Sequence, residues 1–109
     1  MTTLHVKKII NSREADTYDK SDSLHAVILE NLKKNEISIL DFTGIISVTS
    51  SFFNRSIASF YFTSDPETLR KLIKIKSNSL EPYQMLKLER SLRNAKAKIG
   101  GTVSNEAKY

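Results

Sequence analysis

ISILDFTGIISVTSSFFNRSIASFY, residues 37–61, is the stretch around which the rest of the chain is organised. It opens with an apolar run, residues 37–42, which is broken only by Ser38 and Asp41 and is typical of a buried strand. A hydroxyl-rich segment follows. Residues 51–61 then carry apolar side chains at helical spacing, namely Phe53, Ile57, Phe60 and Tyr61. The stretch therefore predicts a strand, a polar loop and a helix, and such a loop often carries the contact surface of an α/β domain.

Two motifs within this stretch resemble a known family. Leu40-Asp41-Phe42-Thr43-Gly44-Ile45, followed by Thr49-Ser50-Ser51-Phe52, is similar to the strand-to-helix signature of STAS domains, the fold of anti-sigma-factor antagonists. More closely, the chain resembles the bacterial STAS-like family that has no assigned function. That family commonly shows an S-F-x-[DN]-E run, which Ser51-Phe52-Phe53-Asn54 follows, with Arg55 where an acid is common. In the antagonist motif an acid precedes the serine pair, and Thr49 stands in its place here.

The resemblance implies a protein partner with a histidine-kinase-like ATPase fold. In the antagonists, the partner phosphorylates a serine that aligns with Ser50, so the resemblance makes Ser50 the candidate phosphoacceptor, with Thr49 and Ser51 as alternates. It places the contact surface on the loop 45–52 and the following helix. The contact residues that it implies are Asp41, Thr43, Gly44, Ser47, Phe52, Asn54 and Arg55, with Arg13 as a further candidate because a Ser-Arg pair is common there in the family.

The hydroxyl residues at 49–51 allow two interpretations. A phosphate on Ser50 would meet free backbone N–H groups at the start of the helix, and it would place about two negative charges on a surface that a partner must bury. Alternatively, these side chains only cap the helix and contribute about 0.5–2 kcal/mol to its stability. Asp41 is open to a similar choice, because an acid at a strand end often accepts hydrogen bonds from loop amides beside a turn such as Thr43-Gly44.

Length and composition indicate one soluble domain. The chain has 109 residues, of which 39% are hydrophobic and 27% charged, and it has no cysteine. No apolar run approaches the roughly 20 residues of a membrane span, and the N-terminus lacks a signal pattern. We therefore expect a cytoplasmic protein without disulfides, in which residues 1–99 form the STAS-like domain and residues 100–109 form a disordered tail.

The net charge of +5 comes mainly from the last third of the chain. These basic residues can keep a helix face solvated, or they can bind an acidic partner or nucleic acid. We do not expect nucleic-acid binding, because no aromatic residues alternate with the charges and no helix-turn-helix pattern is present.

The sequence gives no support for catalysis. The histidines, His5 and His25, share no local metal-ligand spacing with an acid. With three glycines in total, the chain has no P-loop and no G-x-G-x-x-G or G-x-S-x-G motif. We expect a non-catalytic protein with no cofactor and no metal.

The first half of the chain otherwise predicts a strand over residues 4–10 and a short helix that begins at Ser12. Residues 17–23 are polar and predict a loop or a frayed helical turn. Residues 23–34 carry a helical apolar stripe, and Asn35 is a left-handed residue after that helix.

In the second half, Asp65-Pro66 predicts the start of a short helix, residues 72–76 alternate like a strand, and residues 80–97 predict the last helix, stopped by Gly100-Gly101. The order predicts an α/β fold, a small STAS-like β-α-β-α-β-α domain whose short, mainly parallel sheet is covered by helices. The sheet has fewer strands than a full STAS domain, so a homodimer formed through an open edge is a further expectation.

The function that we expect is a regulatory protein-interaction module, switched by phosphorylation at the loop between strand and helix. The alternatives are a self-assembling structural module and a basic accessory protein that binds nucleic acid.

Overall fold

The computed structural model describes residues 1–100, and the side chains of residues 98–100 are excepted. In chain order, its elements are β1 (Thr2–His5), α1 (Val6–Ile10), β2 (Glu14–Ala15), α2 (Tyr18–Lys33), β3 (Ser38–Asp41), β4 (Ser47–Val48), α3 (Ser50–Ser56), the 3-10 helix η1 (Ala58–Phe62), α4 (Pro66–Leu72), β5 (Ile73–Ile75) and α5 (Pro82–Gly100). The fold is α/β, as the sequence predicts. The predicted tail lies outside the described residues apart from Gly100, the last residue of α5.

The main sheet has three parallel strands in the order β1-β3-β5. Its register places Leu4, Leu40 and Ile75 in one row across the strands. Leu40 in the central strand is fully buried, which is expected because parallel sheets pack against helices. A second, two-stranded parallel sheet joins β2 to β4. The small, mainly parallel sheet is therefore confirmed, and β2 with β4 is an addition to it.

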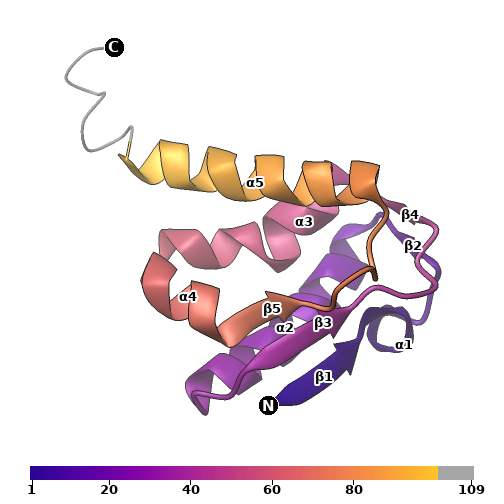
Figure 1. Cartoon of the computed structure of the whole chain (residues 1–109), viewed down its shortest axis with the longest axis horizontal. Coiled ribbons are helices and arrows are strands. Elements are labelled where there is room, and N and C mark those ends of the chain that lie inside the picture. Colours follow the sequence, from indigo (N-terminus) through magenta and orange to yellow (C-terminus); the bar gives the residue numbers. More distant parts are fainter. Residues whose placement is uncertain (101–109) are drawn as a thin grey trace.

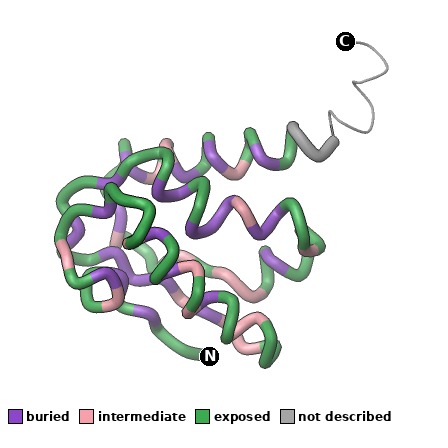
Figure 2. Tube along the Cα trace, turned by 180° about the vertical axis from the view of Figure 1, so that it is seen from behind, coloured by how far each residue is buried: buried purple, intermediate pink, exposed green. Residues whose placement is uncertain are grey.

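The helices form layers beside the main sheet. Figure 1 shows α2 behind the strands, α3 above them and α5 as the outermost layer across α3. Helix α2 packs on α3, and α3 in turn packs on α5. Figure 2 shows buried positions recurring turn by turn along α5, which is the pattern of an amphipathic helix with one face on the core.

Three phenylalanines fill the space between β3 and α3. Phe42, Phe52 and Phe53 are each no more than 1% exposed. Phe53 lies edge-on to both others, with ring centroids 5.9 Å from Phe42 and 6.3 Å from Phe52. This arrangement is the favoured geometry of aromatic pairs, and it fixes α3 against the end of the central strand.

The first predicted strand is too long. Pairing with β3 ends at His5, and residues 6–10 form α1 instead. Val6 and Ile10 are both buried, and their spacing of four residues matches one face of a helix rather than an alternating strand. Asn11 then ends α1 with a left-handed backbone, φ 54°.

One further expectation in the first half is wrong, because Ser12 does not begin a helix. Its hydroxyl accepts a hydrogen bond from the Glu14 amide at 3.0 Å and forms a turn that leads into β2. Of the two possibilities for the polar segment 17–23, the helical one is correct. The segment is the start of α2, which Thr17 caps by accepting from the Lys20 amide at 3.3 Å.

The helix expected over residues 51–61 is interrupted. Helix α3 ends at Ser56, and the chain continues as η1 after Ile57. The hydroxyls of Ser56 and Ser59 donate to carbonyls four residues back, those of Phe52 and Arg55, at 2.6 and 2.7 Å. Such bonds commonly bend helices.

The elements predicted in the second half and the residue after α2 are confirmed, but the bounds of two elements differ. The strand is residues 73–75, and the last helix begins two residues later than expected and includes Gly100, which was expected to stop it. Asp65 caps α4 by accepting from the Thr68 amide at 3.0 Å, and Pro66 follows in the first turn. Asn35 has a φ of 61°, and α5 begins at Pro82.

Gly44 provides a test of the turn after β3. Its φ of 90° disfavours any side chain, and an added Cβ would lie 2.9 Å from Cδ of Lys7. We expect Gly44→Ala to lower the free energy of unfolding by about 1–3 kcal/mol, measured by chemical denaturation. Adding Lys7→Ala should recover little of this loss because the backbone strain remains. Full recovery would instead show that the contact with Lys7 is the whole cost.

Candidate functional site

The carboxylate of Asp41 is the centre of the candidate site. It lies at the carboxyl end of β3, is 6% exposed, and accepts two hydrogen bonds from Thr43 at Oδ1, one from the amide at 3.0 Å and one from the hydroxyl at 2.6 Å. Its Oδ2 lies 3.4 Å from Nδ1 of His5 and 3.6 Å from Nζ of Lys76. Asp41 thus joins the ends of β1 and β5 to the loop after β3.

This arrangement keeps Asp41 ionised. The hydrogen bonds from Thr43 lower the pKa of the Asp41 carboxyl below its usual range, and the positive charge of Lys76 adds to the effect. Burial acts in the opposite direction but is outweighed. The sequence allows a structural role or a contact role for Asp41, and these contacts are the ones that a structural role requires.

The loop after Gly44 is held by backbone hydrogen bonds to the segment around β2. The Ile46 amide donates to the Arg13 carbonyl at 2.8 Å, and the Thr49 amide donates to the Ala15 carbonyl at 3.1 Å. Arg13, which was implicated only by the family resemblance, therefore lies beside this loop and is exposed. The pairing of β2 with β4 positions the loop rigidly against the domain.

The three consecutive hydroxyl residues at the start of α3 have different environments. Thr49 is the N-cap, and its hydroxyl accepts from the Phe52 amide at 3.1 Å. Ser50 and Ser51 occupy the first turn of α3 and are exposed, and within the described part of the chain neither hydroxyl has a hydrogen-bond partner. We call residues 47–51, which also include the exposed Ser47, the hydroxyl loop. Thr49 is exposed as well, so the difference within the loop is that the Thr49 hydroxyl is engaged as the cap while those of Ser50 and Ser51 are not.

Phe52 is, like Asp41, a predicted contact residue that the structure buries. Phe52 is 1% exposed and packs on Phe53, so its side chain cannot form a contact surface of the folded domain. The motif has an apolar residue at position 52 because this side chain packs in the hydrophobic core. Asn54, Thr43 and Gly44 are exposed, as a contact surface requires.

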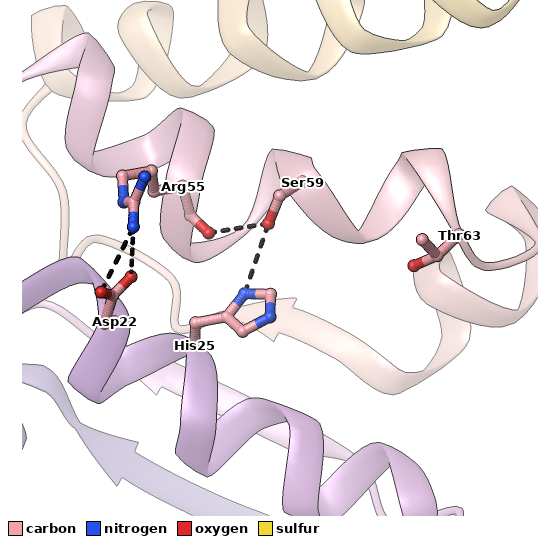
Figure 3. Close-up of a pocket in the computed structure, with 5 residues that line it drawn as sticks. All are labelled: Asp22, His25, Arg55, Ser59 and Thr63. Atoms are coloured by element: carbon pink, nitrogen blue, oxygen red, sulfur yellow. Dashed lines mark hydrogen bonds and ion pairs between the residues drawn. The ribbon is translucent and has the colours of Figure 1, made fainter. Parts of the chain in front are cut away.

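Arg55 points toward Asp22 on α2 and lines a groove between α2 and the α3–η1 segment (Figure 3). Its guanidinium donates to both carboxylate oxygens of Asp22, at 3.0 and 3.3 Å, and lies 4.5 Å from the centroid of the Tyr18 ring. These contacts hold Arg55 against α2. It is therefore a link between helices as well as an exposed side chain.

The groove has a volume of about 360 Å³, and His25, Ser59 and Thr63 complete its lining. The His25 ring stacks on Phe60 with centroids 4.1 Å apart, and its Nδ1 lies 3.3 Å from the Ser59 hydroxyl (Figure 3). No sequence pattern places His25 beside Ser59, because the two residues are brought together by the packing of α2 against η1.

The family model described as "STAS-like domain of unknown function (DUF4325)" matches residues 22–81, more than half of the chain. The chain belongs to this STAS-like family. The matched residues include Asp41, the hydroxyl loop and α3, whereas β1 and α5 lie outside them. No curated protein and no solved structure gives a significant match.

Sequence reasoning missed the partners of Asp41 in this STAS-like domain. His5 and Lys76 come from positions at the ends of β1 and just after β5, far from Asp41 in the sequence. A signal did exist, because carboxyl ends of neighbouring parallel strands meet at one edge of a sheet. This signal does not lead to His5 as long as the first strand is expected to end at residue 10, because His5 then lies in the middle of the strand and not at its carboxyl end.

Two searches of the described residues concern metals and membranes. No group of three or more histidine or acidic side chains among them is placed to hold a metal ion. None of the described helices is both long and apolar enough to cross a membrane.

The division of roles in the hydroxyl loop can be measured by stability. We expect Thr49→Ala to lower the free energy of unfolding by about 1 kcal/mol because α3 loses its cap. Ser50→Ala and Ser51→Ala should change it by less than about 0.5 kcal/mol, as for exposed positions without partners. Urea denaturation of the three variants provides the comparison. Equal losses at Thr49 and Ser50 would show that both hydroxyls stabilise the helix.

The network around Asp41 predicts a pH dependence. Since folding lowers the pKa of Asp41, its stabilising contribution is present above the ordinary carboxyl pKa and is lost as the pH falls through the lowered value. Asp41→Asn should therefore reduce stability by about 1–2 kcal/mol at neutral pH. The difference from the unchanged protein should close below about pH 4.

Glu67→Gln is the matched control for this experiment, because it removes an exposed carboxylate that pairs with Arg70 at 2.9 Å on α4. Exposed pairs of this kind contribute little. A gap for Asp41→Asn that stays constant into acid would show that the charge of Asp41 does not stabilise the fold.

Proposed function

We propose that this STAS-like domain is a non-catalytic regulatory module that binds a protein partner through the hydroxyl loop and the first turn of α3. The observation that supports this most is the exposure of Ser50 and Ser51 on a loop whose backbone is otherwise fixed by the Thr49 cap and by β4. Binding residues often lie on loops that a rigid scaffold positions.

We further propose that phosphorylation of Ser50 regulates this binding. The antagonist STAS domains that the chain resembles are phosphorylated at the aligned serine by a kinase-type ATPase. The partner that we propose therefore has a histidine-kinase-like ATPase fold. Because Thr49 provides the cap, a phosphate on Ser50 need not break the bond that begins α3. It would add about two negative charges to the contact surface and weaken binding to a partner that must bury that surface.

Variants at position 50 test the switch. We expect Ser50→Ala to bind the partner as the unmodified protein does and Ser50→Asp to bind at least about tenfold more weakly, because a buried, unpaired charge costs several kcal/mol. The partner is isolated from the native cells with the unmodified chain, and affinities are then measured by isothermal titration calorimetry.

Ser23→Asp is the matched control, since it introduces the same charge at an exposed serine on α2, outside the hydroxyl loop. It should leave the affinity unchanged. If Ser50→Asp binds as tightly as Ser23→Asp, position 50 is not a switch.

A self-assembling module is the second candidate. In the described part of the chain, β1 and β5 each pair on one side only, so both edges of the main sheet have unpaired backbone groups. Open edges of this kind can pair with a second copy. Sedimentation analysis distinguishes the candidates: a mass that rises with concentration favours assembly, and a constant monomer mass favours the regulatory module.

A further inference from the structure

The outer face of α5 combines exposed apolar side chains with an excess of positive charge. Tyr83, Leu86, Arg90 and Arg93 follow one another at intervals of three, four and three residues, which places them along one side of the helix. Tyr83 is 54% and Leu86 60% exposed, and both arginines are exposed. We call these four residues the α5 face.

The α5 face borders the hydroxyl loop. Nζ of Lys87, beside Leu86, donates to the carbonyl of Val48 in β4 at 3.0 Å. Figure 1 shows α5 and α3 starting at the same end of the molecule, next to β4. Ile46, two residues before Val48, is 57% exposed and adds an aliphatic side chain on the loop. A partner that covers Ser50 can therefore extend onto α5.

The apolar residues indicate what class of partner fits. Protein interfaces combine an apolar or aromatic centre with a charged rim, and tyrosine and arginine are enriched in them. A nucleic-acid site instead depends mainly on cations for phosphates, with aromatic platforms for unpaired bases, whereas exposed aliphatic side chains such as Leu86 and Ile46 are typical of the apolar centre of a protein interface. The composition of this surface therefore favours a protein.

The charge of the α5 face indicates which charge the partner's contact surface carries. Arg90, Arg93 and the neighbouring Lys87 are positive. Glu89 borders the face on the side of Leu86 and Arg93, so three positive charges outnumber one negative charge there, while Glu81 lies outside the spacing of the face. Complementary charge speeds association and suppresses wrong partners, so the surface that fits this face is acidic.

We propose that the α5 face docks an acidic protein surface with an apolar centre that packs on Tyr83 and Leu86, a proposal that rests on the function proposed above. It names the partner's chemistry and gives the direction of the switch. A phosphate on Ser50 would lie beside the same acidic surface, and repulsion between like charges would release the partner. The basic α5 face attracts this acidic surface, and a phosphate on Ser50 repels it.

Site-specific crosslinking tests the proposal. In the full chain, Leu86 is replaced by the photoreactive residue p-benzoylphenylalanine, the native cells are irradiated, and crosslinked peptides are sequenced by mass spectrometry. We expect crosslinks to a protein segment rich in aspartate and glutamate that also contains apolar residues. The same residue placed at Glu30, an exposed position on α2, should not crosslink to that segment.

Charge reversal on the face provides the second arm. Arg90→Glu combined with Arg93→Glu should reduce the Leu86 crosslink about tenfold or more, since the acidic segment would then meet like charge. Neither arginine has a hydrogen bond or ion pair among the described residues, and an unchanged thermal unfolding curve will confirm that the fold is kept. Crosslinks to nucleic acid, crosslinks only to a second copy, or no crosslink at all would overturn the proposal.

Adding Ser50→Asp separates this inference from the proposed function. A Leu86 crosslink that is lost on charge reversal but not with Ser50→Asp supports the α5 face and refutes the switch. A switch at Ser50 in the calorimetric assay without any Leu86 crosslink supports the proposed function and refutes the α5 face.

Discussion

The carboxylate of Asp41 stands where the three strands of the main sheet end, and the geometry of the site depends on how that charge is satisfied. An ionised carboxylate that is only 6% exposed must be compensated, and Thr43, His5 and Lys76 do so from the loop and from both neighbouring strands. The hydrogen bonds from Thr43 set the direction in which the chain leaves β3. Gly44, with its φ of 90°, completes the turn.

The consequence is a loop with fixed backbone and accessible side chains. Pairing of β4 with β2 holds one part of it, and the Thr49 cap holds the other against α3. The phenylalanine core anchors α3 beneath, so the loop is not free to fold inward. Ser50 and Ser51 are left exposed on a rigid support. This is an arrangement that suits recognition of one surface by a partner, and it carries the regulatory function that we propose.

The elements that the sequence predicts well are those whose local signals agree with their packing. Strand β3 lies within the apolar run 37–42, and β5 lies within the alternating segment 72–76. Helix α4 begins at the Asp65-Pro66 cap. Apolar patterns and caps are local properties, so the sequence shows them directly. The predictions for residues 6–10 and for the segment that forms β2 are wrong, because short segments have too few residues for periodicity to distinguish a strand from a helix. The break after Ser56 depends on two side-chain bonds that periodicity does not show. For the site, the motif led to Asp41 and the hydroxyl loop, but His5, Lys76 and the groove at His25 are assembled by tertiary packing alone.

The central claim is that Thr49 serves the fold while Ser50 serves regulation. Purification of the protein from its native cells, followed by intact-mass and fragment-ion mass spectrometry, tests it most directly. The account predicts a fraction of molecules that carries one phosphate, located on Ser50 and absent from the capping Thr49. A phosphate on Thr49, or a protein without phosphate under all growth conditions, would contradict it.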